Sequence, residues 1–463
     1  MAPTTSDPLA GQHVIVMGAA RQGRALGRWL PTVGARVTLT DSRPASALSD
    51  VLAEFEGTSV TLALGGHPLA LLDDCDVLCV SGGVPLTIPF IQTALQRGIR
   101  VTNDAQLFLE RCPAPVIGIT GSAGKTTTTA LTGAMCRAAG RTTYVGGNIG
   151  NVLLDVLPQI APDDCVVMEL SSFQLELMTT SPAIAAVLNV TPNHLDRHGT
   201  MDAYRAAKAH VYTHQQPTDT AVFGIDDPLA RTMRAEAPGQ TAAFSMREPA
   251  EVGAWLAGDV LHLAHAGKTH EIGPRSMIRL RGDHNVNNVL AASTLAAIRG
   301  VPLGAIRAAI QDFTGEEHRL EQVAEIDGVT WINDSIATAP ERASAALRSF
   351  SEPLVLLAGG RDKNLPWAEF AALAVQTCRA VITFGEFGPQ VAAHIAQAQA
   401  QASGGRLEHV HQVEDLPAAV AAARSLAQRG DVVLLSPGGT SYDAYQDFAA
   451  RGQHFRDLVL GNT

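Results

Sequence analysis

The chain has 463 residues, of which 46% are apolar and 17% charged, and its formal net charge is −11. This length and composition predict a globular protein of roughly two to four domains and exclude a disordered chain. The negative charge, with no basic run, argues against a general nucleic-acid binder, so we expect no nucleic-acid partner.

The cysteines and apolar runs indicate a cytoplasmic protein. None of the six cysteines forms a C-x-x-C pair, and no histidine cluster completes a zinc site. We therefore expect reduced thiols. No apolar run approaches the roughly 18 residues of a membrane helix. The N-terminal segment lacks the pattern of a signal peptide, so no membrane partner is expected.

Short β-rich apolar runs alternate with helical segments along the chain, which is typical of parallel α/β sheets. We predict an α/β fold with three domains. They are an N-terminal Rossmann-like domain at 1–113, a central P-loop-type mononucleotide-binding sheet at 114–315 and a C-terminal Rossmann-like domain at 316–463. The segment 246–281 is poorly periodic, and its strands cannot be placed from the sequence.

A glycine-rich turn, Thr-Gly-Ser-Ala-Gly-Lys-Thr at 120–126, lies between a predicted strand and a predicted helix. Backbone N–H groups of such a turn, and the helix N-terminus behind it, attract phosphate. Lys125 adds a positive charge, and the Thr126 hydroxyl can reach Mg²⁺. The full P-loop pattern has glycine where Ile119 stands, so this is a shortened form. The alternative is a glycine-rich β–α turn without a ligand.

Three further polar residues follow predicted strands or lie close behind them. Glu169 ends a strand, where a carboxylate can hold Mg²⁺ bound to phosphates. His194 follows the next strand, where ligands gather in parallel sheets, and Lys208 lies on the helix after it. Taken singly, each residue fits a structural role better than a functional one: Glu169 a strand-end cap, His194 a surface histidine and Lys208 a solvated helix face.

The first domain begins with a second glycine-containing turn, Gly18 to Gly23, after its first strand. A dinucleotide fingerprint requires glycine where Ala20 stands, so close approach of a dinucleotide pyrophosphate is disfavoured. An NAD-dependent enzyme is therefore the weaker interpretation of this domain.

Together these segments resemble the Mur ligases. The motifs TGSAGKT, GGNIG, ELSSFQLE, NVTPNHLDRHG and GDHNVNN occur in the order of that family, and SSFQLE and NDSIAT are similar to its D-glutamate-adding branch. The resemblance implies ATP-dependent addition of D-glutamate to UDP-N-acetylmuramoyl-L-alanine through an acyl phosphate. It places this reaction in peptidoglycan precursor synthesis and implies a monomeric enzyme.

The resemblance also implies the residues of each site. ATP would be bound by Gly121, Gly124, Lys125, Thr126, Thr127, Asn285, Arg319 and Asp334. Two Mg²⁺ ions would be held by Thr126, Glu169, His194 and Lys208, with a carbamate on Lys208. Lys125, His194 and Lys208 would be catalytic. The UDP substrate would be bound by Gly18, Asp41, Ser42, Arg43, Ser81, Gly82 and Asn148. D-glutamate would be bound by Thr338, Lys363, Ser441 and Phe448. The family's pattern has lysine where this chain has Ile336, which removes one cation near the amino acid.

Two other functions remain as alternatives. A folylpolyglutamate synthase uses the same chemistry but lacks an N-terminal UDP-binding domain. A P-loop kinase or switch NTPase needs the phosphate loop and a Mg²⁺ carboxylate, but it leaves the Lys, Ser and Phe positions of the third domain unexplained.

Overall fold

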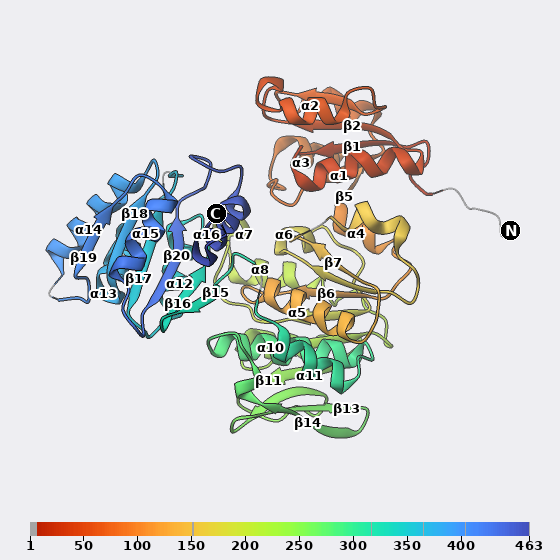
Figure 1. Ribbon diagram of the computed structural model, residues 1–463. Helices are drawn as coiled ribbons and strands as arrows, with labels where there is room; N and C mark the ends of the chain where they lie inside the picture. The colour runs from red at the N-terminus through yellow and green to blue at the C-terminus, as the bar shows by residue number, and fades with distance from the viewer. Residues whose placement is uncertain (1–6, 151, 316, 364, 403, 463) are drawn as a thin grey trace. The chain divides into compact units, whose positions relative to one another are not determined.

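The computed structural model describes residues 7–150, 152–315, 317–363, 365–402 and 404–462. The chain contains three α/β domains, each built on its own sheet (Figure 1). It divides into two compact units. One comprises the first two sheets and includes Asp283–Phe313; the other comprises Leu280–Gly282 and the chain from Thr314 onward. The numbers 1, 316 and 463, which bound the predicted domains, fall outside the described residues.

The N-terminal sheet has five parallel strands in the order β3-β2-β1-β4-β5. Its elements are β1 (His13–Met17), α1 (Arg21–Trp29), β2 (Arg36–Asp41), α2 (Ser49–Phe55), β3 (Thr61–Leu64), β4 (Val77–Val80), α3 (Pro89–Gln96), β5 (Arg100–Thr102) and α4 (Asp104–Leu109). Alternate side chains of β1 enter different cores: Val14 and Val16 one, Ile15 and Met17 the other. Both faces of the sheet are therefore covered, as in doubly wound folds.

The central sheet has nine strands in the order β14-β13-β12-β11-β10-β9-β6-β8-β7. Among the described strands, the pairs β12–β13 and β13–β14 are antiparallel and the other pairs are parallel. Its strands are β6 (Val116–Thr120), β7 (Thr143–Gly147), β8 (Cys165–Glu169), β9 (Ile184–Val187), β10 (Thr220–Gly224), β11 (Gln240–Ser245), β12 (Gly253–Ala257), β13 (Val260–His265) and β14 (Lys268–Pro274). Its helices are α5 (Lys125–Ala138), α6 (Ser172–Leu175), α7 (Leu195–His198), α8 (Met201–Ala209), α9 (Pro228–Arg234), α10 (Asp283–Ile298) and α11 (Leu303–Asp312).

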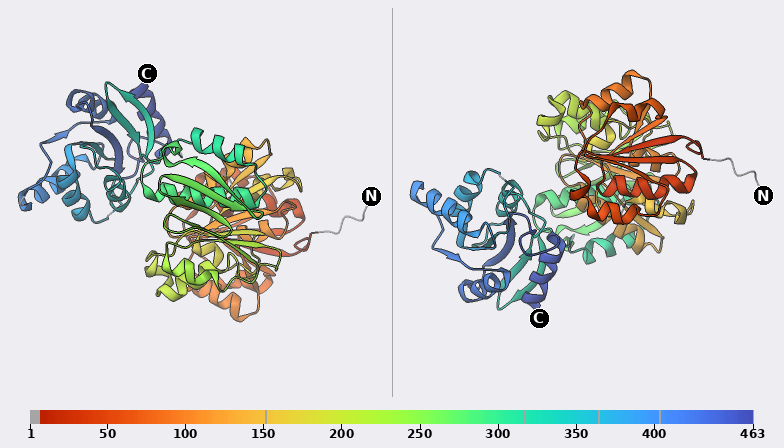
Figure 2. Two further views of the ribbon diagram at one scale, coloured as in Figure 1. Left: turned by 90° about the horizontal axis from the view of Figure 1, so that it is seen from below. Right: turned by 90° about the horizontal axis from the view of Figure 1, so that it is seen from above.

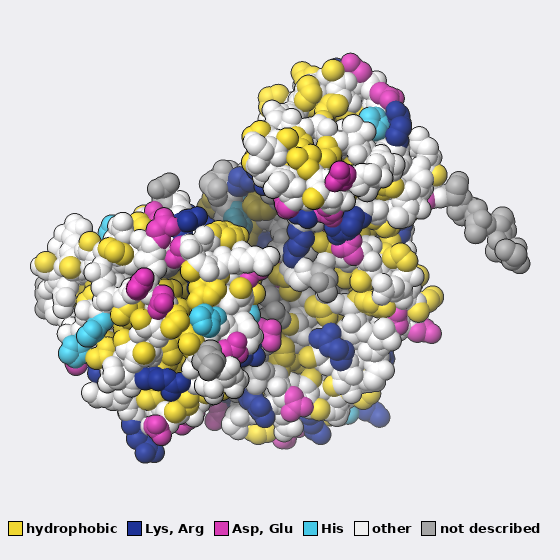
Figure 3. Space-filling model, turned by 45° about the horizontal axis from the view of Figure 1, so that its top comes forward, with side chains coloured by type: hydrophobic (Ala, Val, Ile, Leu, Met, Phe, Trp, Pro, Cys, Tyr) yellow, Lys and Arg dark blue, Asp and Glu magenta, His cyan; other side chains and the backbone are white. Residues whose placement is uncertain are grey.

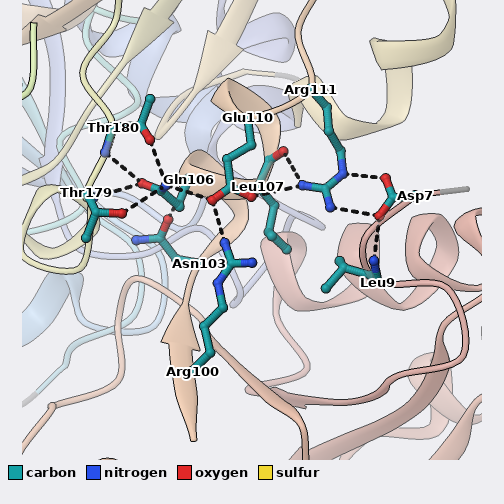
Figure 4. Close-up of polar contacts among 10 residues, drawn as sticks. All are labelled: Asp7, Leu9, Arg100, Asn103, Gln106, Leu107, Glu110, Arg111, Thr179 and Thr180. Carbon is teal, nitrogen blue, oxygen red and sulfur yellow. Dashed lines mark hydrogen bonds and ion pairs between the residues drawn. The ribbon is translucent and has the colours of Figure 1, made fainter. Parts of the chain in front are cut away.

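Helix α4 joins the first two sheets through hydrogen bonds of one buried amide (Figure 4). The Gln106 carboxamide accepts from the backbone N–H groups of Thr179 and Thr180 at 2.9 and 3.2 Å. Its Nε2 donates to both threonine hydroxyls and to Glu110. Beyond the end of α4, Arg111 pairs with Asp7. Because buried amides are costly without partners, this network fixes α4 against the central domain.

The C-terminal sheet has six strands in the order β15-β16-β20-β17-β18-β19, parallel except for β15 against β16. Its elements are β15 (Glu321–Ile326), β16 (Val329–Asn333), α12 (Pro340–Leu347), β17 (Leu354–Gly359), α13 (Ala368–Thr377), β18 (Cys378–Phe384), α14 (Gly388–Gln401), β19 (His409–Gln412), α15 (Leu416–Leu426), β20 (Val432–Gly438) and α16 (Phe448–Leu460). Helices cover both faces of this sheet (Figures 1 and 2), which gives it two separate apolar cores.

The surface carries charges of both signs. On the face drawn in Figure 3, Lys and Arg side chains are interspersed with Asp and Glu. Within the described ranges, every helix is too short or too polar to cross a lipid bilayer.

Candidate active site

The phosphate loop is held in place by side chains of neighbouring segments. The Asn189 carboxamide, which follows β9, accepts from Ala123 N at 2.9 Å and donates to Ala123 O at 3.1 Å. Gly124 caps α5 with φ of 84°, and a Cβ there would lie 2.3 Å from the Asn288 side-chain oxygen. Glycine is therefore required at this position by both backbone conformation and space.

Two predicted loop residues begin α5 beside this turn. Lys125 is its first residue, and Nζ donates to Gly121 O at 2.8 Å, folding the side chain back over the loop. Thr127 lies half-buried in the same first turn. The ammonium group and the helix N-terminus together make the loop electropositive, as a phosphate site requires.

A hydroxyl, a carboxylate and a carboxamide meet at the ends of neighbouring strands. Thr126 Oγ1 donates to Glu169 Oε2 at 2.8 Å, and Asn148 Nδ2 donates to Glu169 Oε1 at 2.9 Å. Glu169 is 2% exposed. Its carboxylate and the Thr126 hydroxyl are hard oxygen donors beside the phosphate loop, so they fit Mg²⁺ bound to phosphates.

Lys208 is buried beside the loop rather than solvated. It is 1% exposed on α8, and Nζ donates to Gly121 O at 2.9 Å. The ammonium lies 4.5 Å from the ring centre of Tyr204, whose hydroxyl lies 3.1 Å from Ser122 Oγ. Burial lowers the pKa of Lys208 well below its usual value, and the nearby charge of Lys125 lowers it further. A neutral amine beside the phosphate loop is therefore accessible.

His194 lies at the exposed start of α7 in the left-handed backbone conformation, with φ of 54°. Its ring makes an edge contact with Phe173, at 5.1 Å between centres. Phe173 stacks on His198, and His198 contacts Tyr204. Ring contacts thus connect His194 to the residue that covers the Lys208 ammonium.

The predicted UDP-site residues lie at the carboxyl ends of β1, β2 and β4, except for Asn148, which follows β7 in the central sheet. Gly18 has φ of 98°, and its carbonyl accepts from Ser81 Oγ at 3.2 Å. Asp41 accepts from Ala19 N at 2.8 Å, and the Arg43 guanidinium holds the pKa of this carboxyl well below its usual range. Ser42 is exposed next to them.

A pocket of about 420 Å³ opens beside this turn, with Ala19, Arg21 and Arg43 in its lining. Gly82 follows Ser81, and a Cβ there would lie 3.5 Å from the Gln174 side chain. Strand ends on both sides of a change in strand order are where ligands bind in open α/β sheets.

The predicted nucleotide residues beyond the loop lie in both units. Asn285, near the start of α10 in the first unit, accepts from Asn288 Nδ2 at 3.0 Å. In the second unit, Asp334 accepts from Ser436 Oγ at 2.8 Å and from Leu320 N at 3.2 Å. Burial raises the pKa of Asp334 to about 7, and the charge of the half-buried Arg319 opposes this rise.

The predicted D-glutamate residues gather at the carboxyl ends of β16, β17 and β20, which are neighbours in the C-terminal sheet. Lys363 Nζ donates to Thr338 Oγ1 at 3.5 Å. Ser441 is buried after β20, next to Thr440, whose backbone pairs with Arg361.

Two more residues complete this edge of the sheet. Phe448 begins α16, and its carbonyl accepts from Ser335 Oγ at 2.8 Å. Ile336, where the family pattern has lysine, is half-buried, and its N–H donates to His318 O at 3.1 Å.

Sequence reasoning did not single out three residues that support these sites. Arg451 is fully buried on α16 and donates to Ser335 Oγ and Ser335 O. Burial lowers its pKa to about 10. Asn189 and Tyr204, which hold the phosphate loop and Lys208, lie within or near the quoted motifs. The spacing of Tyr204 four residues before Lys208 is the signal that could have paired them on one helix face.

Three family models match the chain. A MurD-like N-terminal domain matches 12–103, a Mur ligase middle domain matches 119–296, and the glutamate ligase domain of Mur ligases matches 318–439.

Full-length relatives agree with these matches. UDP-N-acetylmuramoylalanine–D-glutamate ligase of Symbiobacterium thermophilum is 42% identical over 452 residues, which cover 97% of this chain and 98% of the relative. The enzyme of the same name from Pelotomaculum thermopropionicum is 40% identical, with 97% of each chain covered.

Solved structures of low identity share the fold. UDP-N-acetylmuramate–alanine ligase MurC of Thermotoga maritima has a TM-score of 0.59 at 18% identity and covers 98% of this chain and 100% of its own. MurF of Acinetobacter baumannii has a TM-score of 0.57 at 17% identity, covering 97% of this chain and 91% of its own. The near-complete coverage by relatives of one name, together with the phosphate-loop geometry, places this chain in the Mur ligase family, in its MurD-type branch.

Proposed function

We propose that the chain catalyses the ATP-dependent addition of D-glutamate to UDP-N-acetylmuramoyl-L-alanine, a step in peptidoglycan precursor synthesis. The observation that carries the proposal is the group at the phosphate loop, where Thr126 donates to a buried Glu169 and Lys208 is buried beside Gly121. The names of the 42% and 40% identical relatives supply the substrates.

The chemistry explains why ATP is consumed. A carboxylate and an ammonium group do not condense at neutral pH, because both are in unreactive ionic forms. Transfer of the γ-phosphoryl group to the carboxylate gives an acyl phosphate with phosphate as leaving group. The deprotonated amine of glutamate then attacks the acyl carbon, and the tetrahedral intermediate collapses to an amide and phosphate. Positioning and charge stabilisation are the main contributions of the protein in such transfers.

The phosphate loop serves ATP. Backbone N–H groups of the turn around Gly121 and Gly124 would bind phosphate, and Lys125 would offset charge that develops on the transferred group. Thr126 and Glu169 would hold one Mg²⁺, and His194 and Lys208 a second. Mg²⁺ supplies charge neutralisation at phosphoryl oxygens when it is bound. Thr127, Asn285, Arg319 and Asp334 would hold the remainder of the nucleotide.

Lys208 is proposed to carry a carbamate. A neutral amine attacks CO₂, loses a proton and becomes an anionic oxygen ligand suited to Mg²⁺. The burial of Lys208 and its lowered pKa support this proposal, because they favour the neutral amine.

The terminal domains would bind the two compounds to be joined. Strand ends in the first domain would hold the nucleotide-sugar substrate through Gly18, Asp41, Ser42, Arg43, Ser81 and Gly82, and Asn148 of the central domain would contact it as well. Strand ends in the third would hold D-glutamate through Thr338, Lys363, Ser441 and Phe448. The hydrogen bond between Lys363 and Thr338 supports a shared carboxylate site.

We further propose domain boundaries at 113/114 and 315/316, a monomeric state and a cytoplasmic location, with no nucleic acid or membrane as partner. The change of sheet near both positions supports the boundaries.

The test is phosphate release from ATP with substrates omitted in turn. Full turnover is expected when UDP-N-acetylmuramoyl-L-alanine and D-glutamate are both present, and little when either is left out. Phosphate release at the same rate with and without these two compounds would favour a switch NTPase and reject the ligase assignment.

A further inference from the structure

The nucleotide-sugar turn of the first domain is connected to the ATP-site carboxylate through hydrogen bonds of one arginine. Arg21 is the first residue of α1, directly after the turn that begins at Gly18, and it lines the 420 Å³ pocket. Its guanidinium extends from the first domain to the loop that follows β7 in the central domain. Nη1 donates to Gly150 O at 2.5 Å, and Nη2 donates to Asn148 O at 2.9 Å.

The loop that Arg21 holds is packed against Glu169. Asn148 N donates to Glu169 O at 2.9 Å, while the Asn148 side chain donates to the Glu169 carboxylate. Gly147, just before it, has φ of 101°, and a Cβ there would lie 2.4 Å from Glu169 O. The loop therefore has little freedom to shift without moving Glu169. The other carboxylate oxygen accepts from Thr126 of the phosphate loop.

A second connection reaches the segment after Glu169. Asn103, at the N-terminus of α4, donates to Gln174 O at 2.7 Å, and the buried Asp104 accepts from Gln174 Nε2 at 3.4 Å. Gln174 and Ser171 form a capping box at the start of α6, two residues after Glu169. The first domain therefore contacts the loop that precedes Glu169 in the sequence, through Arg21, and the segment that follows it, through Asn103 and Asp104.

We infer that Arg21 is a positioning residue that holds the Asn148 loop, and through it the Glu169 carboxylate, in register with the turn of the first domain. The inference rests on the proposed function for the identity of the ATP and Mg²⁺ site. Occupation of the first domain and geometry at Glu169 are then coupled, because the Arg21 side chain lines the pocket of the first domain and also holds the loop that contacts Glu169. Polar partners one layer behind a metal ligand orient that ligand and tune its affinity.

The chain offers a matched control on the same helix. The Arg28 side chain also extends from α1 to the central domain, where it pairs with Asp155 at 2.8 Å. Asp155 belongs to the short helix Leu153–Gln159 and not to the loop that contacts Glu169. Both arginine side chains are exposed. Because exposed ion pairs contribute little to stability, replacing either arginine is expected to leave the fold intact. Arg28→Ala removes one cross-domain contact without touching the Asn148 loop.

The experiment measures Mg²⁺·ADP binding by calorimetry and steady-state kinetics for wild type, Arg21→Ala, Arg21→Lys and Arg28→Ala. Arg21→Ala is expected to weaken Mg²⁺·ADP binding and to lower kcat by about 10-fold each, the low end for a supporting partner. Arg21→Lys should lie between, because lysine keeps the charge but not the two-pronged geometry. Arg28→Ala, at a residue that lines the same pocket but does not contact the Asn148 loop, should match wild type in Mg²⁺·ADP binding.

Three results would overturn the inference. They are unchanged Mg²⁺·ADP binding in Arg21→Ala, an equal loss in Arg28→Ala, and an increase confined to KM for the nucleotide-sugar substrate, which would make Arg21 a direct substrate contact. The binding readout needs no ligase turnover. If wild type binds Mg²⁺·ADP but forms no D-glutamate product, the proposed function fails while the role of Arg21 is still decided.

Discussion

The glycine that caps the N-terminus of α5 should tolerate no side chain, and the structure gives the magnitude of the loss of stability. Gly124 has φ of 84°, and an alanine Cβ would lie 2.3 Å from Asn288 Oδ1. Asn288 cannot withdraw freely, because it is buried and is hydrogen-bonded to Asn285 and Thr128. The left-handed backbone costs about 1–2 kcal/mol for alanine, and overpacking adds about 1–3 kcal/mol. Gly124→Ala should therefore destabilise the central domain by about 2–5 kcal/mol.

Gly140, after the other end of α5, is the control. It has φ of 76°, but a Cβ there meets no atom within 4 Å. Gly140→Ala should therefore cost the backbone term alone, about 1–2 kcal/mol. The free energy of unfolding is measured in urea, with unfolding of the central domain monitored by hydrogen exchange of peptides from β6 and α5. Phosphate release is a second readout. Equal losses of stability in the two variants would refute the argument from the Asn288 contact.

Three further changes have defined outcomes. Lys125→Ala should keep the fold and lower turnover by about 10²–10³-fold, since a preorganised charge at the reacting phosphate is lost; a folded variant with normal kcat would mean that the loop is not catalytic. Lys208→Ala should be nearly inactive and regain part of its kcat when a short-chain carboxylate is added, because the acid replaces the carbamate oxygens; full activity without added acid would rule out the carbamate. Burial raises the pKa of Asp334 from 3.8 to about 7, so its protonated form stabilises the folded state below about pH 4 and this contribution is lost as pH rises toward 7. Asp334→Asn should thus flatten the decline of unfolding free energy over that pH range in urea titrations, and an unchanged slope would contradict the burial argument.

The strands that carry the proposed sites could be predicted from sequence. β1 and β6 are β-branched runs ending in glycine turns, and the structure places them at the same residues, His13–Met17 and Val116–Thr120. Both are buried on two faces, so the continuous apolar run is a strong signal. The phosphate loop follows directly from the second run.

Other strands gave no such signal. β12, β13 and β14 fill the segment that sequence periodicity left open, and β13 pairs with β14 across an irregular register at Leu261 and His262. Four consecutive residues of β14 are exposed, which removes the apolar alternation. β3 and β19 are short edge strands with few buried side chains, so they too lack a pattern.

The environment of individual polar residues could not be predicted from the sequence either. Lys208 and Arg451 belong to residue types that are rarely buried. Their burial depends on partners distant in sequence: Gly121 accepts a hydrogen bond from Lys208, and Ser335 accepts one from Arg451. The clustering of Thr126, Glu169 and Asn148 could be expected from strand ends, whereas the cross-domain bonds of Arg21 depend on how two sheets pack, which no local pattern encodes.

The proposed enzyme is defined by the amino acid that it joins to the nucleotide-sugar substrate. The most direct measurement supplies UDP-N-acetylmuramoyl-L-alanine and ATP with isotope-labelled D-glutamate and unlabelled L-glutamate at equal concentration, and determines the product by mass spectrometry. Lys363 and Thr338 can pair with the side-chain carboxylate of either enantiomer, but one pocket places that carboxylate and the amine correctly for one of them. We expect a product that carries the label of D-glutamate. A product that contains mainly L-glutamate would contradict it while leaving the acyl-phosphate chemistry intact.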